Sequence, residues 1–158
     1  MTTKYLIAVD PGLMTGVMEF KTTDEGTTMS ASHELGFDDF MDYLVSLDKI
    51  VGDMEDPKDL TVVCEDFIVT METAKKMTAQ MWSLHLIGAL KYLSHKHGFS
   101  LALQKPAQRM SISRDQLKGI GWWHVGGAGH ANQAARHAVV YMLDVLKDKI
   151  LARKILAL

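Results

Sequence analysis

The sequence predicts an α/β fold in which a mixed β-sheet carries α-helices on its faces. The first observation is an N-terminal pair of apolar, β-prone runs, 4–9 and 16–20, separated by a Pro-Gly turn. The second is a change to helical spacing after residue 36. The third is that two later apolar runs, 60–64 and 99–104, alternate with helical segments. A hairpin followed by alternating strands and helices is typical of a mixed sheet flanked by helices.

The elements of the first half follow in order. The turn sequence KTTDEGTT leads from the hairpin into a third, more polar strand at 28–35. Apolar residues then recur at helical spacing from Phe37 to Val51, which predicts an amphipathic helix of about four turns. The acidic sequence GDMEDPKD ends that helix. Residues 60–64 form a short apolar run between polar flanks, as in a strand in the interior of a sheet.

The second half predicts a long helix at 73–97, ended by Gly98, and then the strand at 99–104. The sequence KPAQRMSISRDQLKGIG is expected to form a helix and a loop, with Pro106 near the helix start. WWHVGGAGH is expected to be a glycine-rich loop. One closing helix is expected from Ala131 onward.

The composition fits one globular domain. The chain has 158 residues, 47% of them hydrophobic, which suffices for one core. Its one cysteine, Cys64, excludes an internal disulfide framework and favours a reducing compartment. No apolar run reaches the roughly 20 residues of a membrane span, and the N-terminus lacks a signal-peptide pattern. We therefore expect a single domain over residues 1–158, cytoplasmic and without a membrane partner.

The charge is divided unevenly along the chain. Residues 1–70 contain 15 Asp and Glu but 4 Lys and Arg, a net charge of −11. Residues 71–158 contain 4 acids and 13 bases, a net charge of +9. This division is a reason to expect a polyanion bound to the second half. The alternative is that solvated surfaces happen to divide in this way.

Three carboxylates follow predicted strands. Asp10 and Glu65 each come at the C-terminal end of an apolar strand, where open α/β sheets place ligands and catalytic groups. Two acids on one rim would form a site for hard cations such as Mg²⁺. The alternative is an acid in a turn and a glutamate on the surface. Asp66 should face away from Glu65, because side chains alternate along a strand.

The beginning of the predicted C-terminal helix adds a third candidate. His130, Gln133, Arg136 and His137 recur at three- and four-residue spacing and so share one face. His130 is a candidate metal ligand or proton shuttle, or else a residue at the helix start. For His137 we favour a buried core histidine with satisfied ring nitrogens.

Together, the blocks LIAVDPGLMTGV, TVVCEDFIV and GHANQAARHAVVYML resemble RuvC-type Holliday junction resolvases, especially the divergent, phage-encoded branch. LQKPAQRM lies between the second and third blocks, so the resemblance covers essentially the whole chain. It implies an RNase H-like fold: a five-stranded mixed sheet, its first three strands antiparallel, flanked by helices. It also implies Mg²⁺- or Mn²⁺-dependent hydrolysis of branched DNA.

By this resemblance Asp10, Glu65 and His130 are the expected catalytic and metal-binding residues of a two-metal site. Gln133 stands where the family usually has Asp, and a neutral amide binds Mg²⁺ more weakly. Asp66 would supply the missing charge if the backbone bends after the strand.

Basic and aromatic residues of the second half are expected at the DNA. Lys and Arg on loops and helix starts suit phosphate contacts, and tryptophans can stack on an exposed base. The candidates are Lys75, Lys76, Lys105, Arg109, Arg114, Lys118, Trp122 and Trp123. For the two tryptophans, a place in the core or at a subunit interface is the alternative that we slightly prefer.

The expected function is therefore a structure-selective endonuclease for four-way DNA junctions, in recombination, repair or phage DNA processing, acting in a bacterial or phage-infected cell. Two symmetric nicks need two active sites, so a homodimer is expected. One alternative is a branched-DNA-binding module whose cleavage is weakened or lost through Gln133. Another is an actin-like phosphotransferase fragment, suggested by DPGLMTG, but 158 residues leave no room for its second domain.

Overall fold

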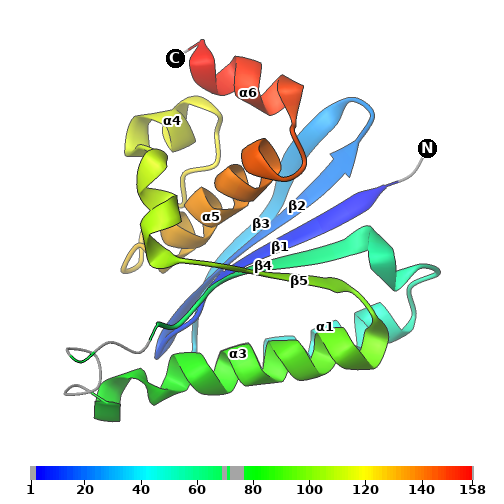
Figure 1. Cartoon of the computed structure of the whole chain (residues 1–158), viewed down its shortest axis with the longest axis vertical. Helices are drawn as coiled ribbons and strands as arrows, with labels where there is room; N and C mark the ends of the chain where they lie inside the picture. Colours follow the sequence, from blue (N-terminus) through cyan, green and yellow to red (C-terminus); the bar gives the residue numbers. More distant parts are fainter. Residues whose placement is uncertain (1–2, 69–70, 72–76, 158) are drawn as a thin grey trace.

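The computed structural model describes residues 3–68, 71 and 77–157, which fold into a five-stranded sheet with helices on both faces (Figure 1). The strands are β1 (Lys4–Asp10), β2 (Met14–Thr23), β3 (Gly26–Gly36), β4 (Leu60–Glu65) and β5 (Ser100–Gln104). The helices are α1 (Phe37–Gly52), α3 (Met77–His97), α4 (Arg114–Gly119), α5 (His130–Asp144) and α6 (Lys149–Leu156). Short 3₁₀ helices precede β4 (Pro57–Asp59) and follow β5 (Pro106–Ser111).

The strands lie in the order β3-β2-β1-β4-β5. The first three strands pair antiparallel through tight turns. β4 runs parallel to β1, and β5 runs parallel to β4, because each returns to the sheet through a helical connection. The predicted α/β class and the mixed sheet with three antiparallel strands are confirmed.

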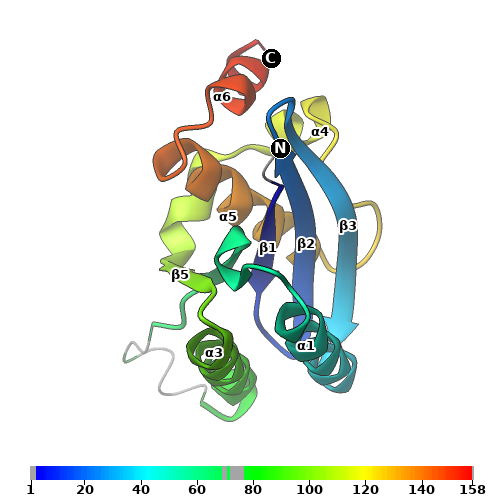
Figure 2. The same ribbon diagram turned by 90° about the vertical axis from the view of Figure 1, so that its right-hand side faces the viewer.

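Helices cover the two faces of the sheet (Figures 1 and 2). α1 and α3 pack on one face, and α5 packs on the other with α4 and α6 beside it. Side chains alternate along β1, so Val9 packs toward α1 and α3 whereas Ala8 packs toward α5. Among the described residues, no helix is both long enough and apolar enough to cross a membrane.

The face of α5 that contacts the sheet is made of small residues. Ala131, Ala134, Ala135 and Ala138 have no exposed surface. Alanine side chains are short, so the helix lies close to β1 and β2, where most of its contacts with the sheet occur. This close packing brings the first residue of α5, His130, to the end of β1.

The C-terminal segment differs from the prediction of one closing helix. The chain breaks between α5 and α6, where Lys147 has a positive φ of 54°. Asp148 then begins α6 by accepting hydrogen bonds from the backbone N–H groups of Ile150 and Leu151. The Thr27 hydroxyl of β3 also donates to Asp148, over 3.3 Å. The predicted long helix ends at His97 as expected, and residues 72–76 of its expected start lie outside the described residues.

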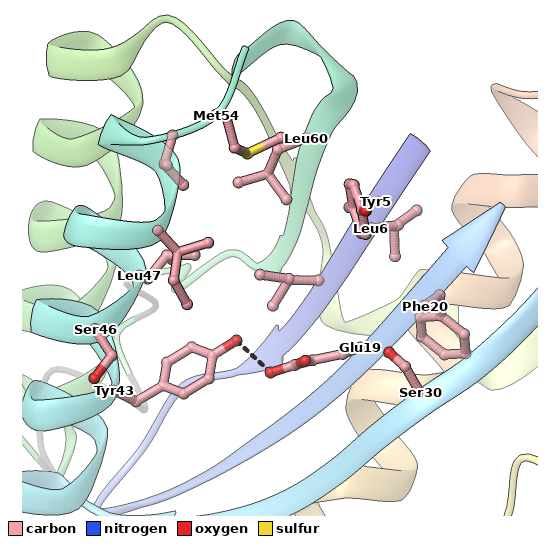
Figure 3. A pocket seen from close by; sticks show the side chains of 13 residues that line it. Tyr5, Leu6, Glu19, Phe20, Ser30, Tyr43, Ser46, Leu47, Met54 and Leu60 are labelled. Atoms are coloured by element: carbon pink, nitrogen blue, oxygen red, sulfur yellow. Dashed lines mark hydrogen bonds between the residues drawn. The ribbon is translucent and has the colours of Figure 1, made fainter. Parts of the chain in front are cut away.

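A cavity of about 350 Å³ lies between α1 and the sheet (Figure 3). Its lining is mostly apolar, with one polar pair: the Tyr43 hydroxyl of α1 donates to the Glu19 carboxylate of β2 over 2.9 Å. Burial raises the pKa of Tyr43, and the nearby Glu19 charge raises it further, so the phenol stays protonated. This pair links α1 to the sheet.

Candidate active site

One residue from each strand contributes to a row across the sheet, on the face that α5 covers. The row reads Glu34, Gly16, Asp10, Glu65, Gln104, from β3 to β5. Glu34 pairs with Gly16, Gly16 pairs with Asp10, and Glu65 pairs with Gln104. The pairing of Val9 with Cys64 places Asp10 level with Glu65. The parallel strands β1 and β4 thus bring the two predicted acids to the same rim.

Asp10 and His130 are in direct contact. His130 Nδ1 lies 2.8 Å from Asp10 Oδ2. Asp10 is only 8% exposed, and this burial raises its pKa, although the hydrogen bond and charge of His130 oppose the shift. A buried carboxylate whose charge is only partly compensated is well suited to bind a cation.

Gly16 makes the contact between Asp10 and His130 possible. A Cβ at Gly16 would lie 2.1 Å from the carbonyl carbon and oxygen of His130 and 2.4 Å from the backbone nitrogen of Ala131. Those are backbone atoms, so the start of α5 would have to move away from β2. A glycine is required here because the helix backbone lies directly on the strand.

Glu65 is engaged by two partners on the same carboxylate oxygen. Arg109, from the 3₁₀ helix after β5, donates Nη1 to Glu65 Oε2. His137 Nε2 lies 2.8 Å from the same oxygen. Arg109 was predicted to contact DNA phosphate; in this structure its guanidinium pairs with Glu65 instead. The positive charge beside Glu65 therefore comes from the chain itself.

His137 is a buried histidine, as the sequence predicts, but it contacts the row. Its side chain has no exposed surface, and its Nδ1 lies 2.6 Å from the amide oxygen position of Gln104. Burial lowers the pKa of His137 to about 4, with a further contribution from the Arg109 charge, so the ring is neutral at pH 7. A neutral ring has one N–H, which the Glu65 carboxylate requires at Nε2. Nδ1 is then an acceptor, so we assign the Gln104 amide the orientation that places its NH₂ at Nδ1.

Glu34 holds the glycine-rich loop at the start of α5. Its carboxylate accepts from the backbone N–H of Ala128 at 2.6 Å and of Ala131 at 3.1 Å. Burial alone would raise the pKa of Glu34, but hydrogen bonds from Ala131, Ala128 and Gly129 outweigh it and lower the pKa. Gly127 has a φ of +66°, and a Cβ there would lie 2.0 Å from Glu34 Oε2. The loop therefore closes around this carboxylate.

Gln133 and Asp66, the two further candidates for metal ligands, contact neither Asp10 nor Glu65 through any side-chain hydrogen bond found among the described residues. The Gln133 amide oxygen accepts from Arg136 Nη1 at 3.3 Å, and Gln133 lines a pocket beside the glycine-rich loop. The resemblance implies a metal ligand at the position of Gln133. In this structure the residue of α5 that reaches Glu65 is His137, because residues 130 and 137 are two turns apart on one side of the helix. The backbone N–H of Asp66 bonds to the Gln104 carbonyl at 2.7 Å, and Asp66 lines a shallow pocket with Lys105.

The predicted DNA-binding residues other than Arg109 differ in their surroundings. Lys75 and Lys76 lie outside the described residues. Lys105 is exposed beside the rim, whereas Trp122 is only 5% exposed and packs on Phe20 with ring centroids 4.7 Å apart. Trp122 is thus a core residue and does not present a ring to DNA, in agreement with the alternative that we prefer for it.

Trp123 is covered by the chain's own cations. The Arg114 guanidinium lies 5.0 Å from the centre of its ring, and Lys118 Nζ lies 5.8 Å from the same centre. Both cations are exposed on α4. The ring of Trp123 therefore holds two cations at the surface, and stacking of this ring on a base stays a prediction.

The donor atoms on the rim are of the type that binds a divalent cation, but they do not surround a common point in this structure. Within the part of the chain that the structure describes, no group of three His, Cys, Asp or Glu side chains could hold a metal ion. Asp10 and Glu65 are hard oxygen donors held level on rigid strands, and His130 touches Asp10. Mg²⁺ usually binds one or two protein carboxylates and takes its other ligands from water and phosphate. The residues present fit such an ion, provided that Glu65 releases Arg109.

Sequence reasoning missed Gly16, Glu34 and Gln104 as members of the row. Gly16 has a local signal, since a glycine within an apolar strand indicates a close approach of another backbone. Glu34 and Gln104 have no such signal, because their roles depend on strand register.

The chain has an α/β fold with a five-stranded mixed sheet, as expected for an RNase H-like fold. Among solved structures it is similar to the RuvC of T. thermophilus in complex with a Holliday junction, with a TM-score of 0.60 and 12% identity over 91% of this chain and 96% of that one. It is also similar to a Fowlpox virus resolvase in complex with Holliday junction DNA, with a TM-score of 0.42 and 12% identity over 97% and 83%. A weaker likeness is to the PPX-GPPA enzyme of Aquifex aeolicus, with a TM-score of 0.37 and 9% identity over 68% and 38%. No protein-family model and no curated protein matches the sequence.

Proposed function

We propose that this protein is a metal-dependent, structure-selective endonuclease that hydrolyses phosphodiester bonds in four-way DNA junctions. One observation carries the proposal: buried Asp10 lies level with Glu65 and in contact with His130, at one rim of an RNase H-like sheet. The likeness to RuvC, solved with a Holliday junction, supports the fold on which this site is built. The substrate class follows from the resemblance of the three sequence blocks.

Asp10, Glu65 and His130 would hold Mg²⁺ or Mn²⁺ in a two-metal site. The bound ions would supply an activated water and stabilise the leaving oxygen. The chain's own contribution is positioning. β1 and β4 fix the carboxylates, and the close contact of α5 at Gly16 fixes His130. The raised pKa of Asp10, caused by burial, means that a cation stabilises its ionised form.

Arg109 can have two partners in turn, Glu65 and a DNA phosphate. Its guanidinium now neutralises Glu65. A DNA phosphate at the rim would compete for Arg109, since guanidinium groups bind phosphate through paired hydrogen bonds. Moving Arg109 to phosphate would leave Glu65 free to bind the cation. Arg109 would then serve both as a temporary counterion and as the predicted phosphate ligand.

A second candidate is a module that binds branched DNA without cutting it. The absence of a three-donor group among the described residues and the pairing of Gln133 with Arg136 favour this candidate. This second candidate binds the same DNA as the first but does not hydrolyse it.

One experiment separates the two candidates. A labelled four-way junction and a linear duplex of the same arm sequence are incubated with protein and Mg²⁺, Mn²⁺ or EDTA. Denaturing gels then report nicks, and native gels report binding. Nicks in the junction alone, dependent on metal, support the nuclease. A retarded junction without nicks supports the binding module. A junction that is neither nicked nor retarded would reject both candidates.

Two nicks placed symmetrically about a junction need two active sites. We therefore include a homodimer in the proposal, acting in the cytoplasm on recombination or phage DNA intermediates. Sedimentation of the free protein tests this part, with a mass of two chains as the expected result.

A further inference from the structure

A second pocket lies beside the candidate active site and has a positively charged lining. Its volume is about 420 Å³, and it lies between the start of α4, the 123–129 loop and the second turn of α5. In Figure 1 the chain after α4 runs beside α5 to the helix start, and the lining of the pocket joins the start of α4 to this loop and to α5. Arg114 and Arg136 line the pocket together with Trp123 and Gln133, and no Asp or Glu lines it.

The positive charge of this pocket is not neutralised by the described residues. Neither Arg114 nor Arg136 has a carboxylate oxygen within 4.0 Å among them. The Nε atom of Arg136 is buried and has no hydrogen-bond partner within the described part of the chain. Its Nη1 donates to Gln133 at 3.3 Å, a long contact to a neutral acceptor. A buried N–H without an acceptor is costly, and a water or an anion that enters the pocket can supply that acceptor.

The walls of the pocket are held at both ends. Asn132 fixes the loop at His124, accepting from its backbone N–H at 2.8 Å and donating to its carbonyl at 3.0 Å. Glu34 fixes the other end at Ala128. The guanidinium of Arg114 is oriented by the ring of Trp123. Groups fixed in this way lose little further conformational entropy when an anion binds.

We propose that this pocket binds a phosphate group of a DNA strand through Arg136 and Arg114, at a subsite separate from the cleavage site. The proposal rests on the proposed function, because it assigns a strand phosphodiester as the anion. Arg136 comes six residues after His130, about 9 Å along the helix axis. We assign the phosphate at Arg136 to a different position of the strand from the phosphate at Asp10. The two bound phosphates together would fix the direction of the strand along α5.

The test uses the full chain with Asp10→Asn as the background, so that a bound junction stays uncut. Arg136→Gln and Arg114→Gln are compared with Arg153→Gln, an exposed arginine on α6. Junction affinity is measured over a range of salt concentrations. We expect each pocket variant to lessen the slope of log affinity against log salt by about one unit, and the α6 control to leave it unchanged. Wild-type affinity and slope in both pocket variants would overturn the proposal.

Two additional measurements keep the result interpretable. Because Arg136 is partly buried, circular dichroism must show a folded variant, and the exposed Arg114 tests the same pocket if Arg136→Gln fails to fold. Inorganic phosphate is the second probe. Its binding to each variant is measured as the increase in the melting temperature of the protein. If no variant binds a junction but phosphate stabilises the parent and not Arg136→Gln, the proposed function fails and the anion pocket stands. If phosphate alone binds strongly while junction binding ignores both arginines, the strand assignment is wrong.

Discussion

Glu34 controls how α5 begins, through contacts with the backbone at the start of this helix. Its carboxylate receives the backbone N–H groups of Ala128, Gly129 and Ala131, which have no partner within the helix. The residue before α5 is Gly129, which offers no side chain to cap it. A carboxylate from another strand therefore takes the place of a local N-cap residue, and its negative charge also suits the helix dipole.

Replacing Glu34 by Gln keeps its size but removes its charge. We expect Glu34→Gln to lower the free energy of unfolding at pH 7 by about 1–2 kcal/mol, because charge-assisted hydrogen bonds become neutral ones. Since folding lowers the pKa of Glu34 below 4.5, this stabilisation is present above that pH and is lost as the pH falls through the folded-state pKa. Urea unfolding at pH 7 and below pH 4 measures the difference. Glu25→Gln, at an exposed position, is the matched control, and equal behaviour of the two variants would contradict the role of Glu34.

At the scale of elements, the packing of α5 on the sheet decides whether His130 reaches Asp10. Asp10 and Glu65 were predictable because each follows an apolar strand directly, which is a local pattern. The row of residues across the sheet that contains these two acids was not predictable, because the pairing of Glu34 with Gly16 depends on the register between β2 and β3. The break before α6 was missed for a similar reason. The contact of Asp148 with Thr27 joins residues far apart in the sequence.

Gly16→Ala tests this packing. The added Cβ would collide with the backbone of His130, so α5 must shift from β2. We expect a loss of stability of about 1–3 kcal/mol, the usual cost of overpacking, and loss of junction cleavage beyond what the lowered stability explains. Gly88→Ala on α3 is the control, because a Cβ there meets nothing within 4 Å. It should stabilise the helix by about 0.5–1 kcal/mol. Thermal unfolding that is unchanged by Gly16→Ala would contradict the observed contact.

The opposite face depends on the link between Tyr43 and Glu19 (Figure 3). Tyr43→Phe removes the hydroxyl and leaves the partly buried Glu19 carboxylate without its donor. We expect a destabilisation of about 1 kcal/mol, with cleavage unchanged, because α1 lies on the far side of the sheet from α5. Denaturation and nicking are measured on the same preparation. A variant that keeps its stability but loses cleavage would place a functional surface at this cavity.

At the scale of the whole molecule, the charge division has a structural basis. The acid-rich first part supplies β1 to β4 and α1, whereas the basic second part supplies α4, α5 and the segment after β5. Asp10 and Glu65 from the first part lie beside Arg109 and Lys105 of the segment after β5, whereas α5, which covers the two acids, has no net charge. This arrangement allows acids to hold cations while arginines and lysines hold phosphate, at one end of one sheet.

Lys105 offers a direct test of that division. It is exposed at the end of β5, beside the rim that carries Glu65. We expect Lys105→Gln to weaken junction binding and to lessen the slope of log affinity against log salt by about one unit, because one DNA phosphate is no longer neutralised. Lys21→Gln, an exposed lysine on β2 of the acidic part, should change neither quantity. Equal effects of the two variants would mean that binding does not depend on the rim.

The central claim is that the acid at the end of β1 performs metal-dependent cleavage of branched DNA. The most direct measurement is the single-turnover cleavage rate of a labelled four-way junction in Mg²⁺ and in Mn²⁺, for wild type, Asp10→Asn and Asp42→Asn. Asp42 is an exposed acid on α1 and serves as the control. We expect Asp10→Asn to lose cleavage in both metals while it binds the junction with nearly unchanged affinity, and Asp42→Asn to cut like wild type. Cleavage at the wild-type rate by purified Asp10→Asn would contradict the account.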